Sequence, residues 1–260
     1  MRPASWSFPS LLVALCLGGT ALADDFRIQT DVYSGKSKIP VSQNTTLFRA
    51  GYVYDYLANP QRIAAVERVA VFDQPHGRFI LLDTVRKQKA EVKTDEVLLF
   101  ASKLQAAVSA KSSNPFTKFA VDPDFEVDFS QDGQLSLSSP HMTYRLKTMA
   151  ANTPEAAGQY REFSDWYGRF NTMSNPGSTP PFARMAVNAE LARRGLVPTE
   201  VNLSIPAQSG VKAASLRSEH HVSWRLLPRD VEKIEATANQ LISFKLVDFD
   251  EFERTSLTKR

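Results

Sequence analysis

Short segments in which apolar and polar residues alternate dominate the chain. The alternation is clearest in residues 26–33 and 197–205, where every second side chain is apolar or Thr. A period of two predicts strands with one buried and one solvated face, which is typical of an antiparallel sheet. The same pattern predicts further strands at residues 45–49, 51–57, 67–73, 78–84, 87–92, 125–130, 134–138, 142–148 and 216–226.

Four longer segments repeat apolar residues every three or four positions, which predicts helices. Thr94 and Thr153 precede two of them and are favoured cap residues. Arg193, Arg194 and Gly195 have the cations and the glycine that are typical of a helix end. The helices are predicted to begin at Thr94, Thr153, Thr179 and Pro228. The last one presents as its apolar stripe Val231, Ile234, Ala238, Leu241 and Ile242.

These elements predict an α+β fold, with a long curved antiparallel β-sheet and about four helices packed on one face. Hairpin turns are indicated at residues 74–77 and 131–133, where Gly77 and Gly133 supply the positive φ that such turns need. We expect residues 24–260 to form a single domain, with a boundary near residue 150 as the alternative. Residues 244–253 mix aromatic and acidic side chains and are expected to form an edge strand or a docked tail.

Residues 1–23 have the pattern of a cleaved signal peptide. Arg2 precedes an apolar run at residues 11–17, and Ala21-Leu22-Ala23 offers a small-residue cleavage site. The run is too short to cross a bilayer, which needs ~20 residues. We therefore expect a mature chain that begins near Asp24 and works in the periplasm or outside the cell.

Charge and cysteine content exclude several classes of function. Loss of Arg2 with the leader lowers the formal net charge from +3 to +2. This balance argues against nucleic-acid binding, which needs clustered positive charge. Cys16 is the only cysteine and lies in the leader, so the mature chain has no thiol for a disulfide, a nucleophile or a metal. No later segment has the ~18 consecutive apolar residues of a membrane span.

Motifs of catalysis and of cofactor binding are absent from the sequence. There is no glycine-rich phosphate loop, no Gly-x-Ser-x-Gly and no His-Glu-x-x-His. His220 and His221 are adjacent in a predicted strand, so their rings point to opposite faces and do not share a metal ion. We therefore expect no cofactor and no metal, and the sequence favours a non-enzymatic protein.

Glu162 and Asp165 support an alternative function. They lie three residues apart on the second predicted helix, beside Trp166 and Tyr167. Paired carboxylates beside aromatic rings are typical of glycan-cleaving sites. The other interpretation is an amphipathic helix with buried rings and solvated acids, in which Arg161 and Asp165 form a surface pair.

Three tyrosines provide the candidate binding surface. Tyr52, Tyr54 and Tyr56 alternate on one predicted strand, so their rings share one face. Tyrosine offers a flat apolar contact with a polar tip, which suits a lipid, glycan or peptide groove. We predict that they line such a groove with Trp166 and Tyr167 opposite them. Packing of the strand under a helix predicts the same pattern.

The succession of strands resembles a known family. Residues 46–56, 69–73 and 78–83, within a region that spans residues 26–92, follow the rhythm of LolA/LolB-like exported bacterial envelope proteins, which carry lipoproteins. The resemblance implies a curved half-barrel sheet and a lipid or lipopeptide as ligand. We thus expect an exported, non-enzymatic protein that binds an apolar or amphipathic ligand between sheet and helices. The alternatives are an envelope glycan hydrolase and a structural or interaction module of the cell surface.

Overall fold

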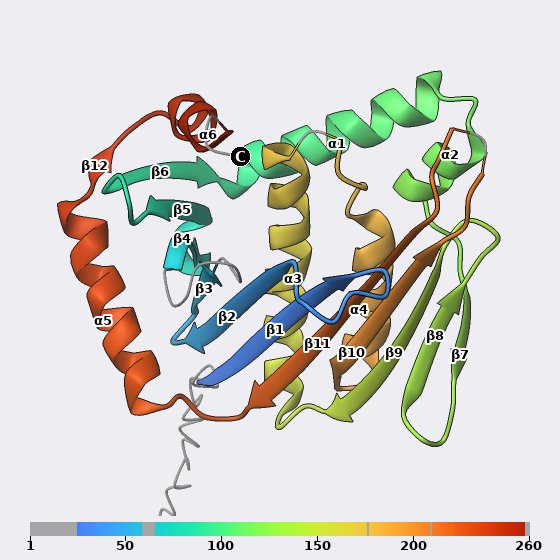
Figure 1. Cartoon of the computed structure of the whole chain (residues 1–260), viewed down its shortest axis with the longest axis horizontal. Coiled ribbons are helices and arrows are strands. Elements are labelled where there is room, and N and C mark those ends of the chain that lie inside the picture. The colour runs from blue at the N-terminus through green and yellow to red at the C-terminus, as the bar shows by residue number, and fades with distance from the viewer. Residues whose placement is uncertain (1–24, 59–65, 176, 209, 258–260) are drawn as a thin grey trace, which may run out of the picture.

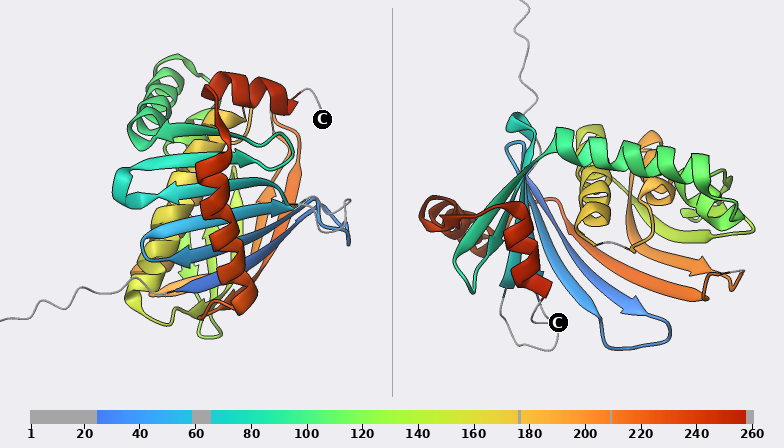
Figure 2. Two further views of the ribbon diagram at one scale, coloured as in Figure 1. Left: turned by 90° about the vertical axis from the view of Figure 1, so that its left-hand side faces the viewer. Right: turned by 90° about the horizontal axis from the view of Figure 1, so that it is seen from above.

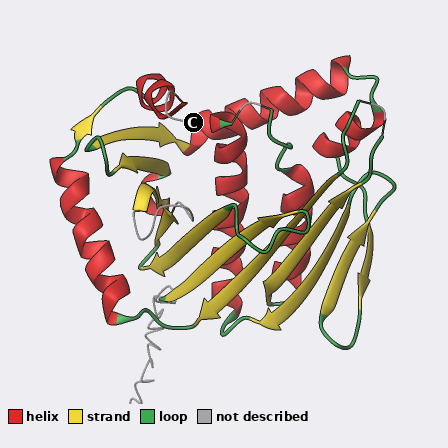
Figure 3. Ribbon diagram, in the orientation of Figure 1, coloured by secondary structure: helices red, strands yellow, loops and turns green. Residues whose placement is uncertain are grey.

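One curved sheet of 12 strands forms the frame of the protein (Figures 1 and 3). The computed structural model describes residues 25–58, 66–175, 177–208 and 210–257, so the predicted signal peptide lies outside the described part. The strands are β1 (Phe26–Ser34), β2 (Ser42–Arg49), β3 (Tyr52–Ala58), β4 (Val66–Asp73), β5 (Arg78–Asp83), β6 (Gln88–Lys93), β7 (Glu126–Phe129), β8 (Gln134–Ser138), β9 (Thr143–Ala150), β10 (Leu196–Ile205), β11 (Ala214–Ser223) and β12 (Lys245–Leu246).

The strand order is β12-β6-β5-β4-β3-β2-β1-β11-β10-β9-β8-β7. Two meanders of sequential strands, β1 to β6 and β7 to β11, therefore meet where β1 pairs with β11. The pairings are antiparallel except for the short parallel pair of β12 with β6. Gly77 and Gly133 stand at two of the turns with φ of 58° and 79°, as hairpin chemistry requires. The predicted α+β fold with a long antiparallel sheet is confirmed.

The helices cover both faces of the sheet. They are α1 (Thr94–Lys111), α2 (Pro115–Val121), α3 (Pro154–Ser174), α4 (Phe182–Arg193), α5 (Pro228–Ser243) and α6 (Phe249–Leu257), with a 3-10 turn η1 (Gln74–His76). We call the face that packs against α3 and α4 the inner face, and the face that α5 crosses the outer face (Figure 2). The predicted cap of α3 is present, since the Thr153 hydroxyl accepts a hydrogen bond from the Ala156 amide at 3.1 Å.

A row of large side chains forms the inner core beneath α3. The row crosses six neighbouring strands in register and consists of Phe26, Phe48, Val53, Phe72, Phe79 and Val92. All six are buried. Phe163 and Phe170 of α3 lie on this row, with ring centroids 5.8 Å from Phe48 and 4.9 Å from Phe79. Burial of this apolar surface fixes α3 across the middle of the sheet.

A second, smaller core lies between the outer face and α5. Ile234 of α5 packs against a set of sheet residues, Leu47, Tyr56, Val69, Val71, Ile80 and Leu82. The Tyr56 hydroxyl and the Thr237 hydroxyl are 2.9 Å apart and hydrogen-bonded. Asp230, at the start of α5, pairs with Arg27 of β1 at 3.6 Å. Contacts along its length thus hold α5 on the outer face.

The structure departs from the sequence-based expectation in several local features. Helix α5 lies on the face opposite to α3, and its buried side chains are Asp230, Ile234 and Thr237, while Ile242 is exposed. The C-terminal segment forms both β12 and α6, and α2 was not predicted. β9 and β10 pair across residue 150, within the same sheet. That residues 24–260 form a single domain stays a prediction.

Candidate functional site

A cavity lies between the inner face and α4, away from the row of rings beneath α3. Its volume is about 170 Å³. Strands β1, β9, β10 and β11 and helix α4 provide its lining, which consists of Val32, Tyr144, Arg184, Val201, Leu203, Leu216, Arg217 and Ser218. An apolar cavity of comparable size, about 150 Å³, takes up benzene in another protein. The space therefore suits a small ring or part of an alkyl chain.

Most of the cavity wall is apolar, and acidic side chains are absent from its lining. Val201 and Tyr144 are buried, whereas Leu216 is 40% exposed and marks the opening. Of the two arginines, Arg217 already has an acidic partner, because its guanidinium pairs with Glu219 and stacks over the Tyr33 ring. Arg184 is the polar group of the wall that α4 contributes.

A chain of hydrogen bonds between α3 and α4 fixes Arg184 in place. Its Nε donates to Asn188 Oδ1 at 3.0 Å, and its Nη2 donates to the Tyr160 hydroxyl at 2.8 Å. Asn188 is fully buried and donates to Asp165 Oδ1 at 2.8 Å. Arg184 is only partly buried, yet within the described residues it makes no ion pair with a carboxylate. Its positive charge is therefore held at the cavity by neutral acceptors.

His220 lies beside the cavity, on the inner face of β11. Its Nδ1 is 3.0 Å from the Thr30 hydroxyl, and its Nε2 is 2.9 Å from the Ser218 hydroxyl. Burial, together with the positive charge of Arg184 and with His221, lowers the pKa of His220 to about 3. The ring is therefore neutral at pH 7, with one nitrogen that donates and one that accepts.

We expect His220 to make the protein less stable as the pH falls from about 6.5 toward about 3. In this range the unfolded chain binds a proton at the histidine and the folded chain does not, so the free energy of unfolding falls by up to about 1.4 kcal/mol per pH unit. In His220→Gln, which does not titrate, this slope should be smaller. Urea denaturation at several pH values measures it.

The control for this prediction is His221→Gln, because His221 is exposed on the outer face of β11. Its pH slope should match that of the wild type. A wild-type slope that survives in His220→Gln would contradict the prediction.

A buried carboxylate, Asp55, lies on the inner face of β3, three strands away from β11. Thr46 Oγ1 donates to Asp55 Oδ1 at 2.7 Å, and Asn44 Nδ2 donates to Oδ2 at 2.8 Å. The Tyr167 hydroxyl of α3 donates to the same carboxylate. Burial raises the pKa of Asp55, and the three hydrogen bonds partly offset this. This cluster joins α3 to the sheet.

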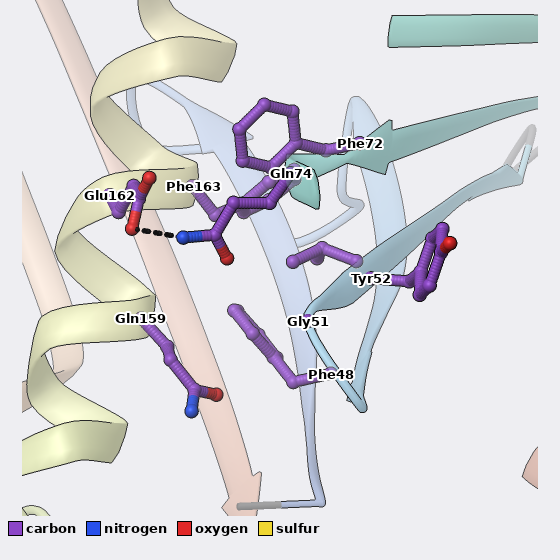
Figure 4. A pocket seen from close by; sticks show the side chains of 9 residues that line it. Phe48, Gly51, Tyr52, Phe72, Gln74, Gln159, Glu162 and Phe163 are labelled. Carbon is purple, nitrogen blue, oxygen red and sulfur yellow. Dashed lines mark hydrogen bonds between the residues drawn. The ribbon is translucent and has the colours of Figure 1, made fainter. Parts of the chain in front are cut away.

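A much smaller hollow lies between α3 and strands β2 to β4 (Figure 4). Its volume is about 10 Å³, which is room for a single water molecule. Glu162 lies at its rim and accepts a hydrogen bond from Gln74 Nε2 at 2.8 Å. The inner face is thus closely packed here, in contrast to the space under α4.

The structure does not bring together the five aromatic residues that the sequence predicts for a groove. Tyr52, Tyr54 and Tyr56 lie on the outer face with α5. Trp166 and Tyr167 pack on the inner face, so the sheet separates the two sets. Figure 4 shows the Tyr52 ring pointing away from α3. A role of these residues in binding stays a prediction.

The two carboxylates of the alternative hydrolase site have different surroundings. Asp165 points toward α4, where it accepts from Asn188 and pairs with Arg161 at 3.6 Å. Glu162 faces Gln74 of η1 instead. Burial raises the pKa of both groups. The predicted pair of Arg161 with Asp165 is present, but Asp165 is buried, so the expectation of a solvated acid at this position is wrong.

The described residues contain no group of three or more His, Cys, Asp or Glu side chains placed to hold a metal ion. They also contain no helix long and apolar enough to cross a membrane.

Matches with known proteins come from solved structures. No family model and no curated protein matches the chain. Among 17 matching chains of solved structures is a LolA superfamily protein, NE2245 from Nitrosomonas europaea. It is 10% identical, with a TM-score of 0.28, over 80% of this chain and 90% of that one. The weak resemblance to LolA-like proteins is confirmed.

Sequence reasoning did not identify the cavity or Arg184. A signal for Arg184 exists in α4, whose buried positions Ala183, Val187 and Leu191 share one stripe. Arg184 and Asn188, one turn apart, flank this stripe as a polar pair. Such a pair beside an apolar stripe is compatible with a surface contact too, so the pattern alone does not indicate a site.

Proposed function

We propose that the protein binds an apolar or amphipathic ligand, such as a lipid or lipopeptide, in the cavity between the inner face and α4. The observation that carries this proposal is the cavity itself, of about 170 Å³, with a wall of Val32, Val201 and Leu203. Removing apolar surface of this wall from water stabilises a complex by about 25 cal/mol per Å². An apolar ligand that covers the wall gains this energy, which supports a binding role.

The cavity is smaller than the ~300–1,000 Å³ of a pocket that surrounds a whole drug-sized ligand. It therefore takes part of a larger molecule, and the rest extends past Leu216 at the opening. A flexible alkyl chain meets both requirements. We further propose that residues 1–23 direct the chain to the periplasm or the outside of the cell, where the ligand is a component of the cell envelope.

Native mass spectrometry of the protein, purified without detergent from its own cell envelope and then extracted with organic solvent, tests the proposal. We expect a reproducible adduct that is lost in Leu203→Trp, because Leu203 lines the cavity and the indole fills it. The matched control is Leu99→Trp, since Leu99 is 55% exposed on α1. This variant should keep the adduct.

Tyr54→Ala decides between the two faces of the sheet. Loss of the adduct in this variant, with retention in Leu203→Trp, would place the ligand under α5 and contradict binding in the cavity. A protein that carries no adduct and takes up no added alkyl ligand would contradict the proposed function altogether.

A further inference from the structure

We propose that Arg184 binds the anionic head of the ligand, and that the ligand is a single-chain amphiphile with a carboxylate. This inference rests on the proposed function and names the class of ligand. Three groups of observations support it: the unused donors of Arg184, the charges that surround it and the size of the cavity.

Some N–H donors of the Arg184 guanidinium have no hydrogen-bond partner within the described residues. Two of its five N–H groups are occupied, by Asn188 Oδ1 and by the Tyr160 hydroxyl. The Nη1 group makes no hydrogen bond within the described residues. Its donors lie in one plane with the remaining donor of Nη2, and a planar carboxylate accepts two parallel hydrogen bonds from this arrangement.

The charges around Arg184 leave its positive charge without compensation. The nearest acid along the hydrogen-bond chain, Asp165, is separated from it by the neutral Asn188 side chain and pairs with Arg161. Burial keeps Tyr144 and His220 neutral, since it raises the pKa of the first and lowers that of the second. A partly buried cation costs solvation energy unless an anion accompanies it. A carboxylate at the cavity supplies that anion.

The lining and the volume of the cavity indicate the apolar part of the ligand. Arg184 of α4 lines the same cavity as Val201 and Leu203 of β10, so an alkyl chain that fills the apolar part brings its head to the guanidinium. The volume of about 170 Å³ accommodates one chain rather than the two of a phospholipid. Octanoate has a chain and a head of this size.

Isothermal titration calorimetry at pH 7 with octanoate, 1-octanol and octyltrimethylammonium tests the assignment. The wild type should bind octanoate more tightly than octanol, and the cationic probe most weakly. In Arg184→Met, octanoate affinity should fall by about 10- to 100-fold, which is the effect of losing a charge-assisted pair of hydrogen bonds. The affinity for octanol should change less than 3-fold, within roughly the effect of a lost methylene contact.

Arg145→Met is the matched control, because it removes the same charge from the exposed outer face of β9. It should leave octanoate affinity unchanged. Acetate separates a bound amphiphile from a free carboxylate: it should bind far more weakly than octanoate, and equal affinity would overturn the amphiphile as ligand.

The outcomes distinguish this inference from the proposed function. Binding of neither octanoate nor octanol contradicts the proposed function, and with it the inference. Equal binding of octanoate and octanol by the wild type leaves the proposed function intact and overturns the role of Arg184. This comparison needs no variant, so it decides the point even if Arg184→Met fails to fold.

Discussion

Replacing Phe48 by Ala is expected to lower the free energy of unfolding by about 4 kcal/mol. The Phe48 side chain is 1% exposed, stacks on the Phe26 ring with centroids 4.0 Å apart and meets Phe163 of α3 at 5.8 Å. Truncation leaves a cavity where the sheet and α3 join, and it removes both ring contacts. Denaturation of the leader-free chain by urea, monitored by circular dichroism, measures the effect.

The control variant is Phe100→Ala on α1. Phe100 is 36% exposed, so the same truncation should cost less than about 1 kcal/mol. Similar losses in the two variants would contradict the packing of α3 on the row of rings that includes Phe48.

Replacing Asp55 by Ala is expected to cost about 3–5 kcal/mol. The change leaves the Thr46 hydroxyl, the Asn44 amide and the Tyr167 hydroxyl without their shared acceptor. A buried donor without an acceptor costs about 1–3 kcal/mol, and part of this is recovered where water enters. The same urea titration measures the loss.

Asp31→Ala serves as the matched control for Asp55. Asp31 lies on the outer face of β1, is partly exposed and accepts one hydrogen bond, from Gln43 Nε2 at 2.9 Å. Its loss should cost about 1 kcal/mol. If Asp55 holds the cluster together, Thr46→Val should cost much less in the Asp55→Ala background than alone, and additive costs would refute the cluster.

The sheet was predictable from the sequence because its strands alternate so regularly. In β10, Val197, Val201 and Ile205 are buried as the period of two indicates. The helices that begin near Thr94, Thr153 and Pro228 were predictable from the spacing of their apolar residues. The predicted cap is present at Thr153 but not at Thr94, whose hydroxyl donates to the Gly77 carbonyl instead. Helix α2 was not predictable, because its seven residues are too few for a periodic pattern.

The periodicity of the sequence does not indicate which face of the sheet each helix covers. On β3 both faces are covered, with Val53 and Asp55 on the inner side and Tyr54 and Tyr56 on the outer side. The sequence pattern indicates that both faces of β3 are buried against other elements. Which helix packs on which face depends on contacts between distant residues, such as Tyr56 and Thr237, which are 181 positions apart. The cavity arises in the same way, since four strands and α4 enclose it.

The pairing of β1 with β11 near the centre of the sheet means that folding depends on contacts between residues far apart in the sequence. Thr30 and His220, which are hydrogen-bonded across this pair, lie 190 residues apart in the chain. Bringing such distant segments together costs chain entropy before any contact repays it, which slows folding. The two meanders therefore cannot pair with each other until almost the whole chain has been synthesised. β1 thus gains its second neighbour only after residues 214–223 of β11 have been synthesised.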